Sequence, residues 1–398
     1  MGHKSFHWSY AACGVGLLVG ASFFAASPAA ASAPNCRVKN INTHHEFAST
    51  DGRALTSALH DAAARGKRTT LQITGVCVGN YKIVDQRIIL VGRATRDLPT
   101  PTLRGVTAVG GSVLHITGAS SDVVITDLRI TGGTGTLTRV LGPDPLLSAA
   151  GGGIYQSGGE LTLRGHTKID HNTAINYAQY PGQDGLTVTL GAGAGIFAAH
   201  AAVRLRDDSL ITDNTSTTGQ YAIGGGGGLY VASGRVRQQD RARIANNLSS
   251  GAMVASPARF SMSDRARIDH NYGGGDADPS GGGVRNDGVL TMQDNASIDH
   301  NQAFYGGGVT NGGLIKLLGH AQIADNAGYL GGGGVWNFGR VAIQTPAIIT
   351  RNLTGDAKFH GGGILNLIST AVVVGDTARI TGNFPDNVWT SCRCRALN

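Results

Sequence analysis

Three copies of the tripeptide Asp-His-Asn stand at residues 170–172, 269–271 and 299–301. A carboxylate beside an imidazole can act in acid–base catalysis, and both groups can bind a metal ion. A catalytic site is normally single, however, whereas this tripeptide recurs along the chain. We therefore expect its residues to be exposed turn residues of a repeated unit.

One grouping has the residue types for breaking an acidic sugar chain by elimination. Arg285 stands near Asp276, Asp278 and Asp287. Elimination needs a base, here Arg285, and carboxylates that hold Ca²⁺ against the substrate. Arg285, Asp276 and Asp278 are therefore weak catalytic candidates, and Ca²⁺ is an expected cofactor only if the protein is a lyase.

Hydrolysis of a sugar chain is the alternative chemistry. It needs two carboxylates about 5 to 10 Å apart. The only acidic doublet is Asp207–Asp208 in LRDDSL, and the other motifs of such hydrolases do not follow it in order. The sequence thus contains no complete catalytic set.

A repeated unit determines where these residues lie. The motif Ile-x-x-Asn recurs at Ile169, Ile211, Ile244, Ile268, Ile298, Ile323, Ile349 and Ile380. Most copies follow a glycine-rich opener by about 15 to 17 residues, and the openers stand at 151–154, 193–196, 226–229, 281–284, 306–309, 332–335 and 361–364. The whole period varies from about 24 to 42 residues. The variation in length therefore lies between each Asn and the next opener.

Within the fixed part of each repeat, short apolar runs end in Gly, Asn or Asp, as in LTLRG at 161–165 and LTMQD at 290–294. Such runs predict short strands bounded by turns. Three strands per repeat predict one coil of a β-helix, with coils stacked about 4.8 Å apart. The recurring Ile side chains then point inward, and the Asn amides form a hydrogen-bonded ladder at one corner. Earlier coils without the opener are expected at 101–105, 112–118 and 122–133.

These repeats resemble those of right-handed parallel β-helix proteins, the pectate-lyase-like superfamily. They are similar in particular to the GGxI and FxxN repeats of chlamydial-type polymorphic membrane proteins, with Ile in place of Phe, over about residues 70–390. The resemblance implies an all-β fold, a single-stranded right-handed parallel β-helix. It leaves the function open, because this scaffold serves lyases, hydrolases, adhesins and binding proteins alike. We expect no autotransporter barrel, since the chain stops shortly after its last repeat.

The chain divides into four expected segments. Residues 1–33 have the polar start, uncharged apolar run and small residues of a secretory signal peptide. Residues 34–70 are expected to form an N-terminal cap that contains an amphipathic helix. Residues 71–390 form the β-helix and 391–398 a C-terminal tail. No segment after the signal is expected to insert into a membrane.

Four cysteines remain after the signal: Cys36, Cys77, Cys392 and Cys394. An even number in an exported protein favours disulfides over a metal site. Cys36 and Cys77 flank the expected helix, so we predict that they are joined. The pairing of Cys392 and Cys394 stays open, and no metal site is expected.

The mature chain has 32 basic and 26 acidic residues and no cluster of five or more Lys and Arg along the sequence. We therefore expect scattered, solvated surface charge and no nucleic-acid partner. The protein is expected to be a monomer.

Aromatic residues gather in the segments of variable length, which leave the solenoid at one corner and therefore line one face. These aromatic residues are Tyr177, Tyr180, Tyr221, Tyr272, Phe304, Tyr305, Tyr329 and Phe359. The outward strand position after each opener holds Tyr155, Phe197, Tyr230, Arg285, Thr310, Trp336 and Leu365. Such rings can stack against sugar rings, or they can pack on one another beneath the segments. The candidate ligand-binding residues are Tyr155, Phe197, Tyr230, Trp336, Tyr221, Tyr272, Tyr305 and Tyr329.

Two functional classes stay open. The first is a secreted or cell-surface protein that binds or adheres to an extracellular polysaccharide or glycosylated surface. The second is a secreted polysaccharide lyase or glycoside hydrolase that acts on an extended glycan. The incomplete catalytic set and the spread of aromatic residues over many coils favour the first class.

Overall fold

The chain divides into two units, residues 1–33 and 34–398, and every residue that the computed structural model describes belongs to the second. The expected signal peptide thus lies outside the described residues, and so do Cys392 and Cys394. The described residues are 35–106, 110–138, 147–179, 187–216, 222–273, 281–344, 346–367, 372–376 and 378–390.

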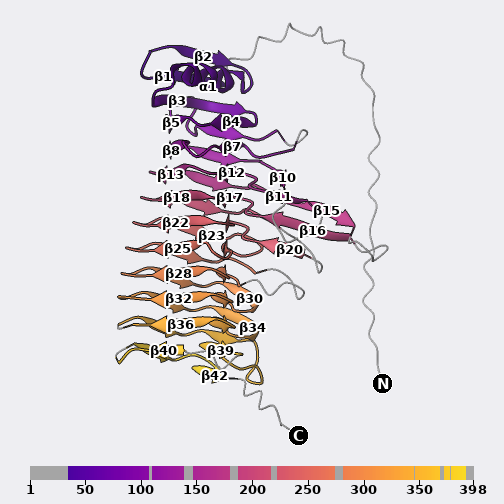
Figure 1. Cartoon of the computed structure of the whole chain (residues 1–398), viewed down its shortest axis with the longest axis vertical. Helices are drawn as coiled ribbons and strands as arrows, with labels where there is room; N and C mark the ends of the chain where they lie inside the picture. Colours follow the sequence, from indigo (N-terminus) through magenta and orange to yellow (C-terminus); the bar gives the residue numbers. More distant parts are fainter. Residues whose placement is uncertain are drawn as a thin grey trace, which may run out of the picture. The chain divides into compact units, whose positions relative to one another are not determined.

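Parallel strands of neighbouring coils stack in two large sheets (Figure 1). The smaller, sheet 1, has eleven strands: β4 (Tyr81–Val84), β7 (Leu114–Thr117), β12 (Ile154–Ser157), β17 (Ile196–Ala199), β21 (Leu229–Val231), β24 (Ala252–Val254), β27 (Val284–Asn286), β31 (Val309–Asn311), β35 (Val335–Asn337), β39 (Ile364–Asn366) and β42 (Val388–Thr390).

The larger sheet covers two faces, because β3 (Thr69–Val78) pairs through its first half with β5 and through its second half with β6. One face, sheet 2, contains β5 (Arg87–Gly92), β8 (Asp122–Thr126), β13 (Glu160–Arg164), β18 (Ala201–Leu205), β22 (Gly234–Gln238), β25 (Arg259–Met262), β28 (Val289–Met292), β32 (Leu314–Leu317), β36 (Arg340–Ile343) and β40 (Val372–Val374). The other face, sheet 3, contains β6 (Thr102–Arg104), β9 (Arg129–Thr131), β14 (Lys168–Asp170), β19 (Leu210–Thr212), β23 (Arg243–Ala245), β26 (Arg267–Asp269), β29 (Ser297–Asp299), β33 (Gln322–Ala324), β37 (Ile348–Thr350) and β41 (Arg379–Thr381).

One turn of the chain contributes one strand to each of these three faces. β12, β13 and β14 form one coil, and β17, β18 and β19 form the next. Each of these strands pairs in parallel with its counterpart one coil away. The described chain is therefore an all-β solenoid of stacked parallel strands, as the repeat predicted.

The Ile of each Ile-x-x-Asn repeat aligns with the Ile of the next coil. Ile298 pairs in register with Ile268 on one side and with Ile323 on the other, and all three are fully buried. Together with the inward Leu and Val residues of sheets 1 and 2 they form one continuous core. The predicted inward stacking of these side chains is confirmed.

The Asn of each repeat forms a ladder at the turn between sheet 3 and sheet 1. The Nδ2 of Asn301 donates to the Oδ1 of Asn326 at 3.0 Å, while the Oδ1 of Asn301 accepts from both the Nδ2 and the backbone N–H of Asn271 at 2.9 Å. The Nδ2 atom also donates to two backbone carbonyls. The pattern continues from Asn172 to Asn383. The predicted ladder is confirmed, and it supplies partners to buried turn groups.

A second asparagine ladder, which the sequence analysis missed, lies on the inward side of sheet 1. Its members are Asn286, Asn311, Asn337 and Asn366, all buried. Each Nδ2 donates to the Oδ1 of the next member at 2.7 to 2.8 Å. The alternation of strand side chains contained the signal, because each Asn stands two residues after the inward residue of its opener.

Each of the three glycines of an opener is required for a different steric reason. Gly306 has a φ of 64°, which is unfavourable for residues with a Cβ. A Cβ on Gly307 would lie 2.3 Å from the carbonyl oxygen of Ala327, and one on Gly308 would lie 2.9 Å from the Cγ2 of Ile323. The opener therefore makes room for the neighbouring chain and for the Ile of its own coil.

The N-terminal part of the second unit contains a helix and a disulfide. The helix α1 (Arg53–Arg65) packs on β1 (Cys36–Asn40), β2 (Glu46–Ser49) and β3 through its buried face (Figure 1). The predicted bond between Cys36 and Cys77 is present and joins β1 to β3. Within the described ranges no helix has the length and apolar character needed to cross a membrane.

Several of the segments that connect a strand of sheet 3 to the next strand of sheet 1 form two small sheets of their own. One contains β10 (Thr136–Thr138), β11 (Ser148–Ala150), β15 (Asn176–Gln179), β16 (Thr187–Ala192) and β20 (Ala222–Gly225). The other contains β30 (Gln302–Tyr305), β34 (Ala327–Gly331) and β38 (Leu353–Thr354). We call these segments the excursions. They leave the solenoid at the same corner, between sheet 3 and sheet 1, as expected.

The ladder predicts a difference between its middle and its end. Asn301 is fully buried, whereas Asn383 is partly exposed. Asn301→Ala leaves buried backbone groups without partners, so it should lower the free energy of unfolding by about 3 kcal/mol, and Asn383→Ala by about 1 kcal/mol. Denaturant titration measures both values. Equal losses of unfolding free energy in the two variants would contradict the expectation that the ladder satisfies buried backbone groups.

Candidate functional site

The residues predicted to share one outward position on sheet 1 do share it. Tyr155 pairs in register with Phe197, and Phe197 with Tyr230. The column continues through Met253, Arg285, Thr310, Trp336, Leu365 and Trp389. Side chains one coil apart can therefore contact each other along this column.

The first part of the column is packed rather than open. The ring centroids of Tyr155 and Phe197 lie 5.2 Å apart, and those of Phe197 and Tyr230 lie 5.6 Å apart, both stacked. Phe197 and Tyr230 are each only 3% exposed, because Ala150 of β11 and Ala192 of β16 pack with them. Burial raises the pKa of Tyr230 to about 12. Of the two alternatives left open by the sequence, the packing of rings on one another describes Phe197 and Tyr230.

The later part of the column carries a partly exposed aromatic group. Tyr305 stacks on Trp336 with centroids 4.4 Å apart, and Phe338 contacts Trp336 edge-on, also at 4.4 Å. All three are partly exposed. We call Tyr305, Trp336 and Phe338 the aromatic cluster. The sequence analysis missed Phe338, although strand alternation places it on the same side as Trp336.

The other predicted tyrosines are spread over the excursions. Tyr272 and Tyr329 are exposed, and the Oη of Tyr329 donates to the Oε1 of Gln302 at 2.8 Å. Tyr221 and Tyr180 lie outside the described residues. Tyr272 forms a β-bridge with the same Gln302, so the two exposed tyrosines both lie beside this residue.

The lyase grouping is described only in part. The Nε of Arg285 lies 3.3 Å from the Oδ2 of Asp287, whereas Asp276 and Asp278 lie outside the described residues. This contact engages the guanidinium of Arg285 in an ion pair. In the part of the chain that the structure describes, no three His, Cys, Asp or Glu side chains gather in a way that would hold a metal ion.

The acidic doublet has structural partners. Asp207 accepts from the backbone N–H of Gly165 at 2.9 Å. Asp208 forms an ion pair with Arg241 at 2.7 Å. The hydrogen bond from Arg241 lowers the pKa of Asp208, so this carboxyl is ionised near neutral pH. It does not suit the role of a proton donor in hydrolysis.

The Asp-His-Asn tripeptides are not simply exposed turn residues, and this expectation is wrong for the aspartates. Their carboxylates are buried and bind an arginine of the preceding coil, which offsets the burial of charge. The ion pairs are Arg129–Asp170, Arg243–Asp269 and Arg267–Asp299. Each histidine is exposed and adopts a left-handed backbone conformation at the turn. The tripeptides therefore link coils.

A basic face on sheet 2 was missed. Arg204 of β18, Arg235 and Arg237 of β22, and Arg259 of β25 occupy outward positions of three successive strands. We call these four residues the arginine cluster. The expectation of scattered charge is wrong for this face. The signal was the alternation of Arg with buried residues in VRLR (203–206) and RVR (235–237).

Comparison with protein family models, with curated proteins and with solved structures finds no match to the chain.

The buried ion pairs predict a pH dependence. Burial raises the pKa of Asp299, but hydrogen bonds, above all from Arg267, outweigh it, so the pKa is lowered overall. A lowered pKa contributes stability above the unfolded value of about 3.9, and this stability is lost as the pH falls through the folded value. Arg267→Gln should therefore destabilise the protein most near neutral pH and progressively less below about pH 4.

Unfolding titrations at several pH values measure this difference. Arg265→Gln is the matched control, because Arg265 is exposed and lies two residues from Arg267. The control should show little effect at any pH. If Arg267→Gln lowers the free energy of unfolding by the same amount at every pH, the proposed role of the Arg267–Asp299 ion pair is contradicted.

Proposed function

We propose that the protein is a secreted or cell-surface right-handed parallel β-helix, similar to pectate-lyase-like proteins, that binds an extended polysaccharide or a glycosylated surface. The observation that carries the proposal is the partly exposed aromatic cluster around Trp336, a member of the outward column of sheet 1.

The chemistry of the cluster suits a sugar chain. Aromatic rings offer broad apolar faces at low conformational cost, and polar groups beside them fix orientation. Thr310 and Arg285 precede Trp336 in the same column, one coil apart each. Since coils repeat about every 4.8 Å, a chain laid along the axis would meet Arg285 and Trp336 roughly two sugar units apart. Arg285, while paired with Asp287, brings a positive charge to this path that suits a carboxylate or sulfate.

Export is part of the proposal. Residues 1–33 have the pattern of a signal peptide, and the Cys36–Cys77 bond fits an oxidising compartment. The similarity of the repeats to those of polymorphic membrane proteins supports a surface role. The helix α1 serves as the cap of the first coils, because solenoids need their terminal coil covered.

Binding is favoured over catalysis. Arg285 is paired with Asp287, and Asp208 is paired with Arg241. The described side chains of Arg285 and Asp208 are thus already engaged in ion pairs. The spread of the column over several coils also suits contact with an extended ligand more than a single reacting centre.

Two substitutions separate binding from packing. Trp336→Ala should weaken retention on the polysaccharide that the purified protein binds in a screen by at least about tenfold, or about 1.4 kcal/mol, while the melting temperature stays within a few degrees. Phe197→Ala should instead destabilise the fold by about 3 kcal/mol, because it removes a buried ring. Affinity electrophoresis and thermal unfolding measure the two effects.

Tyr177→Ala is the matched control, because Tyr177 is an exposed ring outside the column. Tyr177→Ala should change neither the retention on the polysaccharide nor the melting temperature. Unaltered retention of Trp336→Ala on every glycan that binds the wild type would contradict the proposal. Newly formed chain ends in the bound glycan would assign the protein to the lyases or hydrolases.

A further inference from the structure

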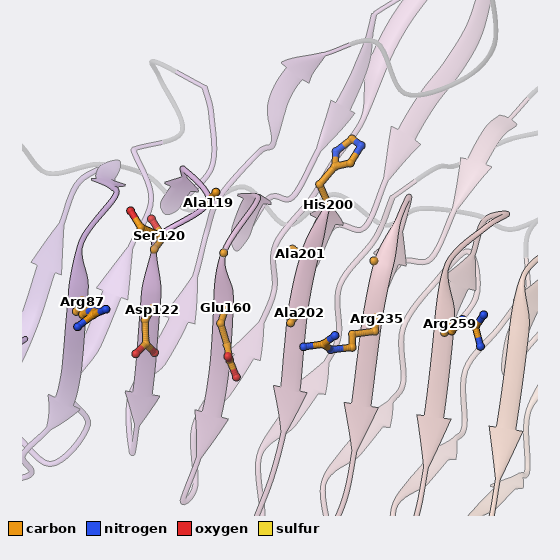
Figure 2. Close-up of a pocket in the computed structure, with 13 residues that line it drawn as sticks. Arg87, Ala119, Ser120, Asp122, Glu160, His200, Ala201, Ala202, Arg235 and Arg259 are labelled. Atoms are coloured by element: carbon orange, nitrogen blue, oxygen red, sulfur yellow. The ribbon is translucent and has the colours of Figure 1, made fainter.

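A row of side chains crosses sheet 2 at one strand position (Figure 2). It consists of in-register residues of six successive strands: Arg87, Asp122, Glu160, Ala202, Arg235 and Arg259. A hollow of about 870 Å³ lies along this row. The small side chain of Ala202 stands at the middle of the row, between Glu160 and Arg235, and leaves the hollow open there.

The arginine cluster adjoins this hollow in a regular array. Arg235 pairs in register with Arg259, and Arg204 with Arg237. The array therefore has two columns, two residues apart along the strands, with a step of about 4.8 Å from coil to coil. Four like charges at such short spacings repel one another unless an anion lies between them.

The acidic residues nearby do not balance this charge. Glu160 forms an ion pair with Arg204. Asp122 forms an ion pair with Arg68, which lies outside the cluster, at 3.3 Å. The guanidinium groups of the remaining members, Arg235, Arg237 and Arg259, have no hydrogen-bond or ion-pair partner among the residues that the structure describes.

The neighbouring charges also act on Arg204. Burial, followed by the charges of Arg237, Arg235 and Arg206, lowers its pKa. Arg206 is partly offset by Asp240 at 3.4 Å. The face therefore has a positive potential that an anionic ligand would relieve.

We propose that the arginine cluster and the adjoining hollow form a binding site for a linear anionic polysaccharide. The site lies on sheet 2 and is separate from the aromatic cluster of sheet 1, so it does not depend on the function proposed for that cluster. The guanidinium fork binds a carboxylate or a sulfate through two hydrogen bonds. Successive charged sugars along the axis would meet Arg235 and then Arg259.

A polysaccharide fits this face better than a single-stranded nucleic acid. Proteins that bind single strands combine basic residues with aromatic side chains on which the bases stack. The two outward columns of sheet 2 contain no aromatic residue from β5 to β36. Charge and spacing thus remain as the recognition features, and both suit a repeating anionic sugar.

The test uses the full mature chain and three immobilised probes. Heparin carries sulfates in addition to carboxylates, polygalacturonate carries carboxylates alone, and dextran is neutral. The wild type should bind at least one of the two anionic probes and not dextran. Stronger binding to heparin assigns sulfate as the preferred group, and stronger binding to polygalacturonate assigns carboxylate.

The decisive variant combines Arg235→Ala, Arg237→Ala and Arg259→Ala. Its affinity for the bound anionic probe should fall at least tenfold. The slope of log affinity against log salt, measured between about 50 and 200 mM, should become shallower by roughly two to three, because fewer counterions are released. If this variant does not fold, the corresponding triple Arg→Gln variant takes its place.

The matched control removes the same charge elsewhere, through Lys67→Ala, Arg96→Ala and Arg379→Ala, which are exposed positions outside the cluster. It should keep its affinity for the anionic probe. If the triple Arg variant binds as tightly as the control variant, the proposal is overturned. The same holds if the wild type binds neither anionic probe. Tighter binding to a single-stranded oligonucleotide than to either polysaccharide at the same salt would also overturn it.

Discussion

The buried asparagine ladder at the turn between sheets 3 and 1 is the interaction on which the rest of the structure depends. Each amide donates to the next amide and to two backbone carbonyls, and its oxygen accepts from the preceding coil. An unpaired polar group at such a buried turn would be costly, so the ladder permits one register of coil on coil. A residue at a given offset from the Asn therefore lies on the same face in every coil.

Both proposed surfaces follow from this register. Neither the aromatic cluster nor the arginine cluster lies within a short stretch of sequence, because each coil contributes one or two members. The excursions can differ in length without disturbing the clusters, since they leave after the ladder. They do alter access, because the small sheet with β11 and β16 covers Phe197 and Tyr230, whereas Trp336 stays partly exposed.

The repeat could be predicted from the sequence because its signals are local. The spacing of opener and Ile-x-x-Asn predicts the coil, the inward Ile and the ladder, and the flanking cysteines predict the Cys36–Cys77 bond. The burial of Asp170 and Phe197 could not be predicted in this way, since it depends on residues one coil away. The arginine cluster is intermediate: Arg235 and Arg259 each stand nine residues before the Ile of their repeats, so an alignment of the coils would have found them.

Hydrogen exchange of the backbone amides tests the central role of the ladder most directly. The backbone N–H of Asn301 donates to the Oδ1 of Asn326 inside the stack, so it should exchange only through unfolding of the whole solenoid, as slowly as the amide of Ile298. The same should hold for Asn247, Asn271 and Asn326. Exchange of these ladder amides as fast as that of amides in the excursion strand β30 would show that the ladder opens locally, and would contradict its role in setting the register.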